Sequence, residues 1–110
     1  MVKYRSEELF RALGTPARVR MVERLSQKGP QSISQMAKPL RISLPGALKH
    51  TKILEEAGIL VCRKEGRVQY CRINSEAFDA LNSWLLTQKI YWERSFDRLE
   101  KHLINRKKNK

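Results

Sequence analysis

The sequence is poor in cysteine, in acidic residues and in long apolar runs. Its two cysteines, Cys62 and Cys71, are too few for the disulfide framework of a small secreted protein, and their spacing is not the C-x-x-C of zinc or redox sites. No run of about 18 apolar residues would span a membrane, and the amino end has no apolar secretory segment. We therefore expect a cytoplasmic protein with no membrane partner.

The motifs of common catalytic and metal sites are also missing. The sequence contains no G-x-S-x-G nucleophile motif, no phosphate-binding glycine loop and no carboxylate pair that suggests a cleft. A borderline metal ion needs about four thiolate or imidazole ligands, whereas the chain has two Cys and two His. We expect neither an enzyme nor a protein with a bound metal or cofactor.

What the sequence does have is positive charge. Its 110 residues carry 23 Lys and Arg against 11 Asp and Glu, a formal net charge of +12. Such an excess indicates nucleic acid or another anionic surface as the partner. The length predicts one domain with a modest core, over residues 1–104, followed by a basic tail at 105–110.

Residues 43–58 have the pattern of a short two-sided helix. Ser43 is a natural N-cap, Pro45 is tolerated in a first turn, and Gly58 is a stop signal. Helical spacing places small and medium residues on one face: Ala47, Thr51, Leu54 and Gly58. The opposite face holds Pro45, Lys49, Lys52 and Glu56. A helix of this kind fits a DNA major groove with its dipole and lysines toward phosphate, although an ordinary amphipathic surface helix has the same pattern.

Three helices are predicted before this segment. The first covers residues 6–13, with Ser6 as a possible cap, and the second runs from Thr15-Pro16 to Gly29-Pro30. The buried side of the second helix is predicted to hold Val19, Met21, Val22 and Leu25. Ser32-x-x-Gln35 is a capping box that starts a third helix, which must end within a residue or two of Pro39. The short connection to residue 43 predicts a helix-turn-helix whose second helix enters the groove.

Residues 59–64 and 68–73 predict a β-hairpin, or wing, with Lys64 and Arg67 at its tip. A two-residue loop at Gly66-Arg67 would place Cys62 directly opposite Cys71. Two interpretations of this pair remain open. The thiols pack as small apolar groups in a reducing compartment, or oxidation joins them and alters the affinity of the wing for DNA.

From Asn74 the chain is predicted to be helical almost to its end, with two helices or a bend at 87–89. Its second apolar stripe comprises Trp92, Phe96, Leu99 and Leu103. A small winged domain cannot bury this stripe alone, so we expect it to form a two-fold dimer interface together with Leu9 and Phe10 of the first helix. The alternative is that the stripe folds back onto its own domain.

Several of these segments together resemble the ArsR-type winged-helix transcriptional regulators. The resemblance runs from about Leu9 to Leu103 and is carried by L-G-T-P-A-R at 13–18, by residues 43–58 ending in K-x-L-E-x-A-G, and by the wing at 63–70. It implies a mainly α fold with a small β-hairpin wing, dimerising through its amino- and carboxyl-terminal helices. It further implies a homodimeric repressor that binds an inverted-repeat operator. The chain is most similar to a subgroup that lacks the metal-sensing motifs.

Two departures from the family pattern concern DNA reading. Leu44 and Leu48 stand where much of the family has Gln and Ser, and leucine contacts a thymine methyl rather than hydrogen-bonding a base edge. His50 matches a position that is commonly histidine, either as a DNA contact or as a structural hydrogen-bonding residue. The predicted DNA-binding residues are Ser43, Leu44, Pro45, Leu48, Lys49, His50, Lys52, Lys64 and Arg67. The alternative function is a non-specific nucleic-acid-binding protein, such as a small RNA-binding or architectural factor.

Overall fold

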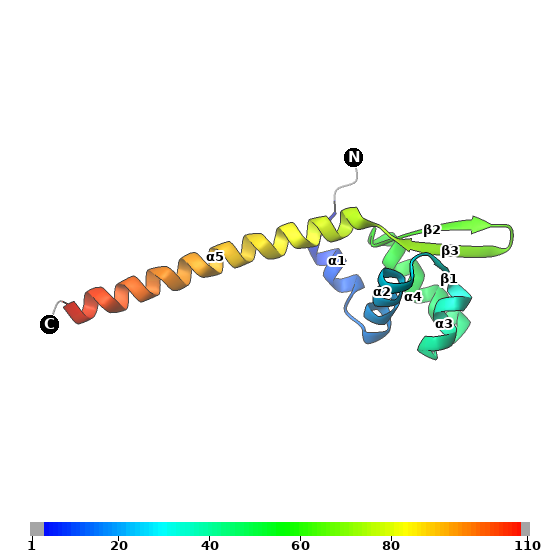
Figure 1. Ribbon diagram of the computed structural model, residues 1–110, viewed down its shortest axis with the longest axis horizontal. Coiled ribbons are helices and arrows are strands. Elements are labelled where there is room, and N and C mark those ends of the chain that lie inside the picture. Colours follow the sequence, from blue (N-terminus) through cyan, green and yellow to red (C-terminus); the bar gives the residue numbers. More distant parts are fainter. Residues whose placement is uncertain (1–3, 109–110) are drawn as a thin grey trace. The chain divides into compact units, whose positions relative to one another are not determined.

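The computed structural model describes residues 4–108 and divides the chain into two compact units, Met1–Ala80 and Leu81–Lys110. The amino-terminal unit holds four helices, a small sheet and the start of a fifth helix (Figure 1). Its elements are α1 (Ser6–Ala12), α2 (Pro16–Lys28), β1 (Gln31–Ser32), α3 (Ile33–Leu40), α4 (Leu44–Glu56), β2 (Leu60–Glu65) and β3 (Val68–Ile73). The last helix, α5, covers Ser75–Lys108 and continues through the carboxyl-terminal unit.

The helix starts follow the capping pattern of the sequence. Thr15 Oγ1 and Ser43 Oγ each accept a bond from a first-turn backbone N–H, at 3.4 and 3.2 Å. Ser32 and Gln35 form both halves of a capping box, at 3.1 and 2.9 Å. Ser6 was wrongly predicted as a cap, because it is the first helical residue and no side chain caps α1.

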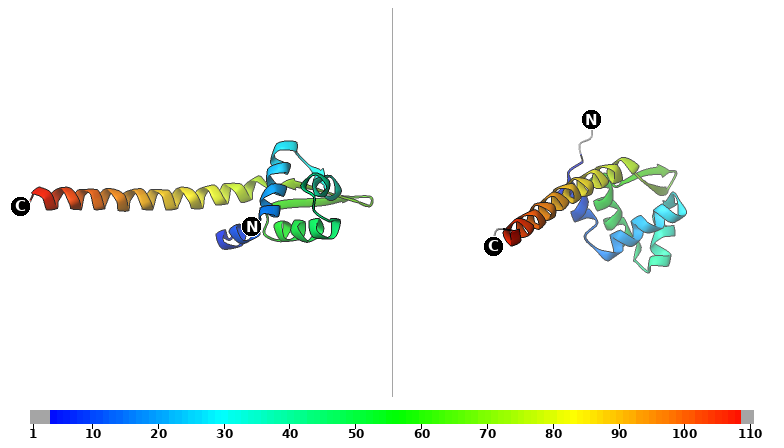
Figure 2. Two further views of the ribbon diagram at one scale, coloured as in Figure 1. Left: turned by 90° about the horizontal axis from the view of Figure 1, so that it is seen from below. Right: turned by 60° about the vertical axis from the view of Figure 1, so that its left-hand side comes forward.

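The turn between α3 and α4 is short and tightly hydrogen-bonded. α3 ends one residue after Pro39, as predicted, and Arg41 adopts a left-handed conformation with φ of 55°. The Ile42 N–H donates to the Ala37 carbonyl at 3.1 Å, which closes the end of α3. This turn sets α4 against α3, and α4 also packs against β2 (Figure 2).

The end of α4 is fixed by a glycine. Gly58 has φ of 87°, and the Ile59 N–H donates to the Leu54 carbonyl at 3.0 Å in the pattern of a Schellman motif. A Cβ at Gly58 would lie 2.6 Å from a ring carbon of Tyr4, so both conformation and space require glycine here. The predicted stop is confirmed, with the last helical residue at Glu56.

The wing is a hairpin with the predicted two-residue loop. Glu65 pairs with Val68 and Cys62 pairs with Cys71, and Gly66 alone in the loop has a positive φ, of 65°, as a type II′ turn requires. The short strand β1 pairs antiparallel with β3, which gives the strand order β1-β3-β2. This third strand was not predicted, because two residues are too few to show a period.

The core of the amino-terminal unit is built from the inner faces of its helices and strands. Its largest fully buried side chains are Leu9, Met21, Met36, Leu54, Ile59, Leu60, Thr51 and Cys71. The predicted inner face of α4 is confirmed, since Ala47, Thr51 and Leu54 are all buried. Val19 was wrongly predicted as buried, because at 100° per residue it falls to one side of the face formed by Met21, Val22 and Leu25.

α5 is one continuous helix of 34 residues, so the predicted break at 87–89 is wrong. Thr87, Gln88 and Lys89 each have a backbone N–H that can continue the helix, and none of them favours a turn. The Thr87 hydroxyl donates to the Ser83 carbonyl at 2.8 Å within the helix. The helix continues to Lys108, so residues 105–108 of the predicted tail are helical. Residues 109–110 lie outside the described part. Among residues 4–108, no helix is long and apolar enough to cross a membrane.

Candidate nucleic-acid interface

The outer face of α4 presents most of the predicted DNA-binding residues together. Ser43, Leu44, Pro45, Leu48, Lys49 and Lys52 are exposed, and His50 is half-buried. The Ser43 cap and Pro45 place the positive end of the helix dipole at the same end as the two exposed leucines. This face therefore combines a dipole, two lysines and apolar surface within about three helical turns.

His50 is held by a residue from another helix. Arg18 Nη1 lies 3.3 Å from His50 Nδ1, and because a guanidinium only donates, Nδ1 must accept. Partial burial first, and then the charges of Arg18 and Lys49, lower the pKa of His50 below its usual value of 6.5. Neutral His50 thus carries its proton on Nε2, as a hydrogen-bond donor.

Arg18 is in turn fixed by the end of α1. Its Nε donates to the Ala12 carbonyl, and its Nη2 donates to the Arg11 carbonyl at 3.4 Å. This role of Arg18 was not predicted from the sequence. The L-G-T-P-A-R segment, where an arginine follows the helix cap by three residues, is a local signal for the contacts with the end of α1 but not for the contact with His50.

The wing tip and the start of α4 share one groove. It has a volume of about 350 Å³ and is lined by Ser32, Ile33, Ser34, Leu44, Leu48, Lys64, Arg67, Val68 and Gln69. The structure thus brings both exposed leucines of α4 together with both predicted cations of the wing. Gln69 was not predicted, and it adds a side-chain amide to the same groove.

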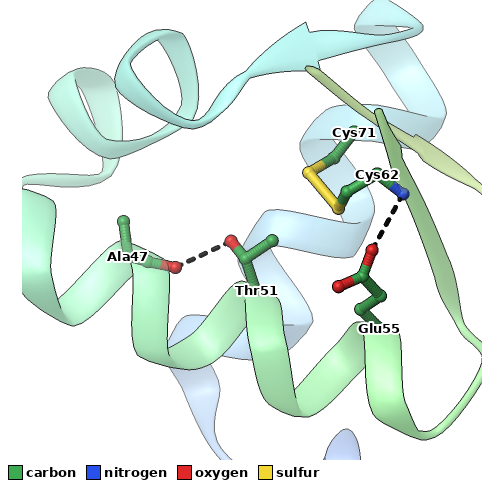
Figure 3. Close-up of a disulfide and its surroundings, with 5 residues drawn as sticks. All are labelled: Ala47, Thr51, Glu55, Cys62 and Cys71. Carbon is green, nitrogen blue, oxygen red and sulfur yellow. Dashed lines mark hydrogen bonds between the residues drawn. A yellow bond between two sulfur atoms is a disulfide. The ribbon is translucent and has the colours of Figure 1, made fainter. Parts of the chain in front are cut away.

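Behind this face, a disulfide joins Cys62 and Cys71 across β2 and β3 (Figure 3). The two residues are directly opposite in the sheet, with Cα atoms 4.1 Å apart. The pair lies over α4 near Thr51, and the Cys62 N–H donates to Glu55 Oε2 of α4 at 3.3 Å (Figure 3). The interpretation of the cysteines as free thiols is therefore wrong for this structure, because the register brings them within bonding reach. An effect of this bond on DNA binding stays a hypothesis.

The predicted dimer residues fall into two groups. Trp92, Phe96, Leu99 and Leu103 of α5 each leave half or more of their surface exposed. Phe10 is 40% exposed, whereas Leu9 is only 1% exposed. Leu9 is thus already covered within its own chain and has almost no surface left for a partner, which corrects its predicted role.

Among residues 4–108, no group of three or more His, Cys, Asp and Glu side chains could bind a metal ion.

The chain is similar to known proteins in both sequence and fold. Residues 13–63 match a protein family described as a helix-turn-helix domain. An HTH-type transcriptional regulator of Methanocaldococcus jannaschii is 34% identical over 67 residues, which are 60% of this chain and 75% of the relative.

The crystal structure of an ArsR family transcriptional regulator is 40% identical, with a TM-score of 0.74 over 79% of this chain and 94% of that one. The chain belongs to the ArsR family. This ArsR-family protein is thus a DNA-binding transcriptional regulator, and its predicted winged helix-turn-helix fold is confirmed.

A second solved structure similar to this ArsR-family protein is more distant. The solution structure of a homodimeric winged helix-turn-helix domain from Mycobacterium bovis is 21% identical, with a TM-score of 0.62 over 80% of this chain and 82% of that one. At this identity the similarity shows the fold alone.

Proposed function

We propose that the protein is a homodimeric repressor that binds an inverted-repeat operator with the recognition helix at 43–57 and the wing at 59–73. The observation that carries the proposal is the shared groove, in which the exposed start of α4 and the basic wing tip form one surface. A helix that fits the major groove beside a basic hairpin that reaches the flanking backbone matches the geometry of duplex DNA.

The residues of this surface divide into phosphate and base contacts. Lys49, Lys52, Lys64 and Arg67 bind phosphates and position the protein. Ser43 and His50 Nε2 donate hydrogen bonds, and Leu44, Pro45 and Leu48 make apolar contacts in the groove. Arg18 orients His50, since it fixes the tautomer that donates toward DNA.

The stripe of α5 supports the dimer. Trp92 and Phe96 are 70% and 59% exposed, and aromatic side chains of this kind are typical anchors of protein interfaces. We propose that the stripe and Phe10 form a two-fold interface. A related winged helix-turn-helix domain is described as homodimeric, which supports association of two chains. Two recognition helices would then enter successive major grooves about 34 Å apart.

The test is selection from random duplex DNA by the purified protein, at a salt concentration near physiological. We expect an enriched inverted repeat whose half-sites lie about ten base pairs apart. A bound pool without any enriched sequence would overturn the proposal and favour a non-specific nucleic-acid-binding protein. Sedimentation of the same sample should give the mass of two chains.

The repressor assignment needs a separate measurement. The selected operator is placed over a promoter, and transcription in vitro is followed as protein is added. We expect transcript to decrease with the occupancy of the operator. An increase in transcript would instead identify an activator.

A further inference from the structure

Two leucines stand out on the recognition helix because they are exposed. Leu44 is 50% and Leu48 is 46% exposed, whereas Leu25, Leu54 and Leu60 of the same unit are at most 2% exposed. The two are four residues apart on α4, so their side chains lie one above the other on one side of the helix. Single exposed leucines are ordinary, but this pair forms a continuous apolar strip at the start of the helix.

The strip is flanked by positive charge. Lys64 and Arg67 of the wing line the same groove as Leu44 and Leu48. An apolar partner would remove these cations from water without neutralising them, and a partner with phosphate alone would leave the leucines exposed. The matching surface has an apolar group beside phosphates. In the DNA major groove the only such group on the four bases is the C5-methyl of thymine.

We propose that Leu44 and Leu48 determine sequence specificity by packing against pyrimidine C5-methyl groups in each half-site. This inference rests on the proposed function, since it requires α4 to lie in the major groove. The operator should then contain thymine at one or two fixed positions under each α4. Each methyl removed from the contact should weaken binding by about fourfold, from the transfer free energy of one buried carbon.

The experiment uses the full-length protein and the selected operator with thymine replaced by deoxyuridine, one position at a time. This change removes only the methyl group and leaves the hydrogen-bonding edges of the base pair unchanged. We expect about fourfold weaker binding for one half-site and more than tenfold for both. In Leu48→Ala or Leu44→Ala the same replacement should have no effect at the position that the missing side chain contacted.

Lys49→Ala is the matched control, because it weakens binding but should remain as sensitive to deoxyuridine as the unaltered protein. Thermal unfolding of each variant checks that the fold is intact, which we expect because both leucines are exposed. A further duplex carries 5-methylcytosine in place of cytosine. If 5-methylcytosine strengthens binding and deoxyuridine has no effect, the leucines contact methylated cytosine. If deoxyuridine weakens binding and 5-methylcytosine has no effect, they contact thymine.

The outcomes separate this inference from the proposed function. Failure to select any sequence would count against the proposed function itself. A selected operator that binds equally well with thymine or uracil at every position, and equally with or without methylated cytosine, would leave the function intact and overturn the inference.

Discussion

The two units of the chain differ in the burial of their large apolar side chains. In the amino-terminal unit the large apolar side chains of α2 and α3 are mainly buried, and no buried side-chain polar atom within residues 4–108 lacks a hydrogen-bond partner. In α5 every described side chain from 82 to 106 is exposed, including two tryptophans and several leucines. The first unit has a buried core of its own, whereas α5 has the apolar surface that the proposed dimer would cover.

The largest effect is expected for Trp92→Asp. A carboxylate in the centre of the proposed interface would be buried without a partner, so the dimer should dissociate into monomers in sedimentation experiments. Operator affinity should fall by a factor of about 100 or more, because the second recognition helix no longer binds at a high effective concentration. Thr87→Asp changes the charge equally on the opposite side of α5 and should remain dimeric. A dimeric Trp92→Asp protein would place the interface elsewhere.

Leu54→Ala should lower the free energy of unfolding by about 2 to 5 kcal/mol, because Leu54 is fully buried and its loss leaves a cavity. Leu99→Ala should change it by less than about 0.5 kcal/mol, because that side chain is exposed in the single chain. Denaturant unfolding of both variants in the monomeric Trp92→Asp background makes the comparison independent of association. Equal effects would mean that α5 shares the core of the first unit.

Reduction of the Cys62–Cys71 disulfide should lower the free energy of unfolding by about 2 kcal/mol, because the unfolded chain is no longer cross-linked. Cys62→Ala should remove this dependence on thiol reductant. The same oxidised and reduced samples decide the switch hypothesis. Equal operator affinities would end it, whereas a difference would link the wing bond to DNA binding.

Lys49→Ala and Arg67→Ala should each weaken operator binding and flatten its salt dependence. If each subunit neutralises about four phosphates, the slope of log K against log salt is about −7 for the dimer, and each variant should reduce it by about one unit per subunit. Lys101→Ala on α5 is the control and should leave the slope unchanged. An unchanged slope in the first two variants would remove these residues from the DNA surface.

The smallest effect is expected from the titration of His50. Its pKa is lowered in the folded state, so above about pH 6.5 the neutral side chain contributes fully to stability. As the pH falls through 6.5, the unfolded chain binds a proton before the folded chain does, and stability decreases. Urea unfolding between pH 5 and 8 should show a decrease that His50→Gln lacks. Parallel curves for the two proteins would show that folding does not lower the pKa of His50.

The parts that could be predicted from the sequence are those fixed by neighbouring residues. The caps at Thr15, Ser32 and Ser43 each depend on contacts within one turn, and the two-residue hairpin loop fixes the pairing of Cys62 with Cys71. The Arg18–His50 contact joins residues 32 apart in the chain, and no local pattern contains it. The same holds for the groove between α4 and the wing, which depends on packing between elements.

The backbone conformation and surroundings of Gly58 predict which amino-acid substitutions the chain tolerates. Gly58 and Gly66 both have positive φ, but a Cβ would meet the ring of Tyr4 at Gly58 and nothing within 4 Å at Gly66. In a library of single substitutions both positions should therefore favour glycine, and Gly58 should tolerate fewer replacements than Gly66, because a side chain there also meets the Tyr4 ring. The space around Gly66 leaves the wing tip open to solvent, whereas the connection between α4 and β2 is filled by the Tyr4 ring. Changes of side-chain size are therefore expected to be tolerated better at the tip of the wing than where the wing joins α4.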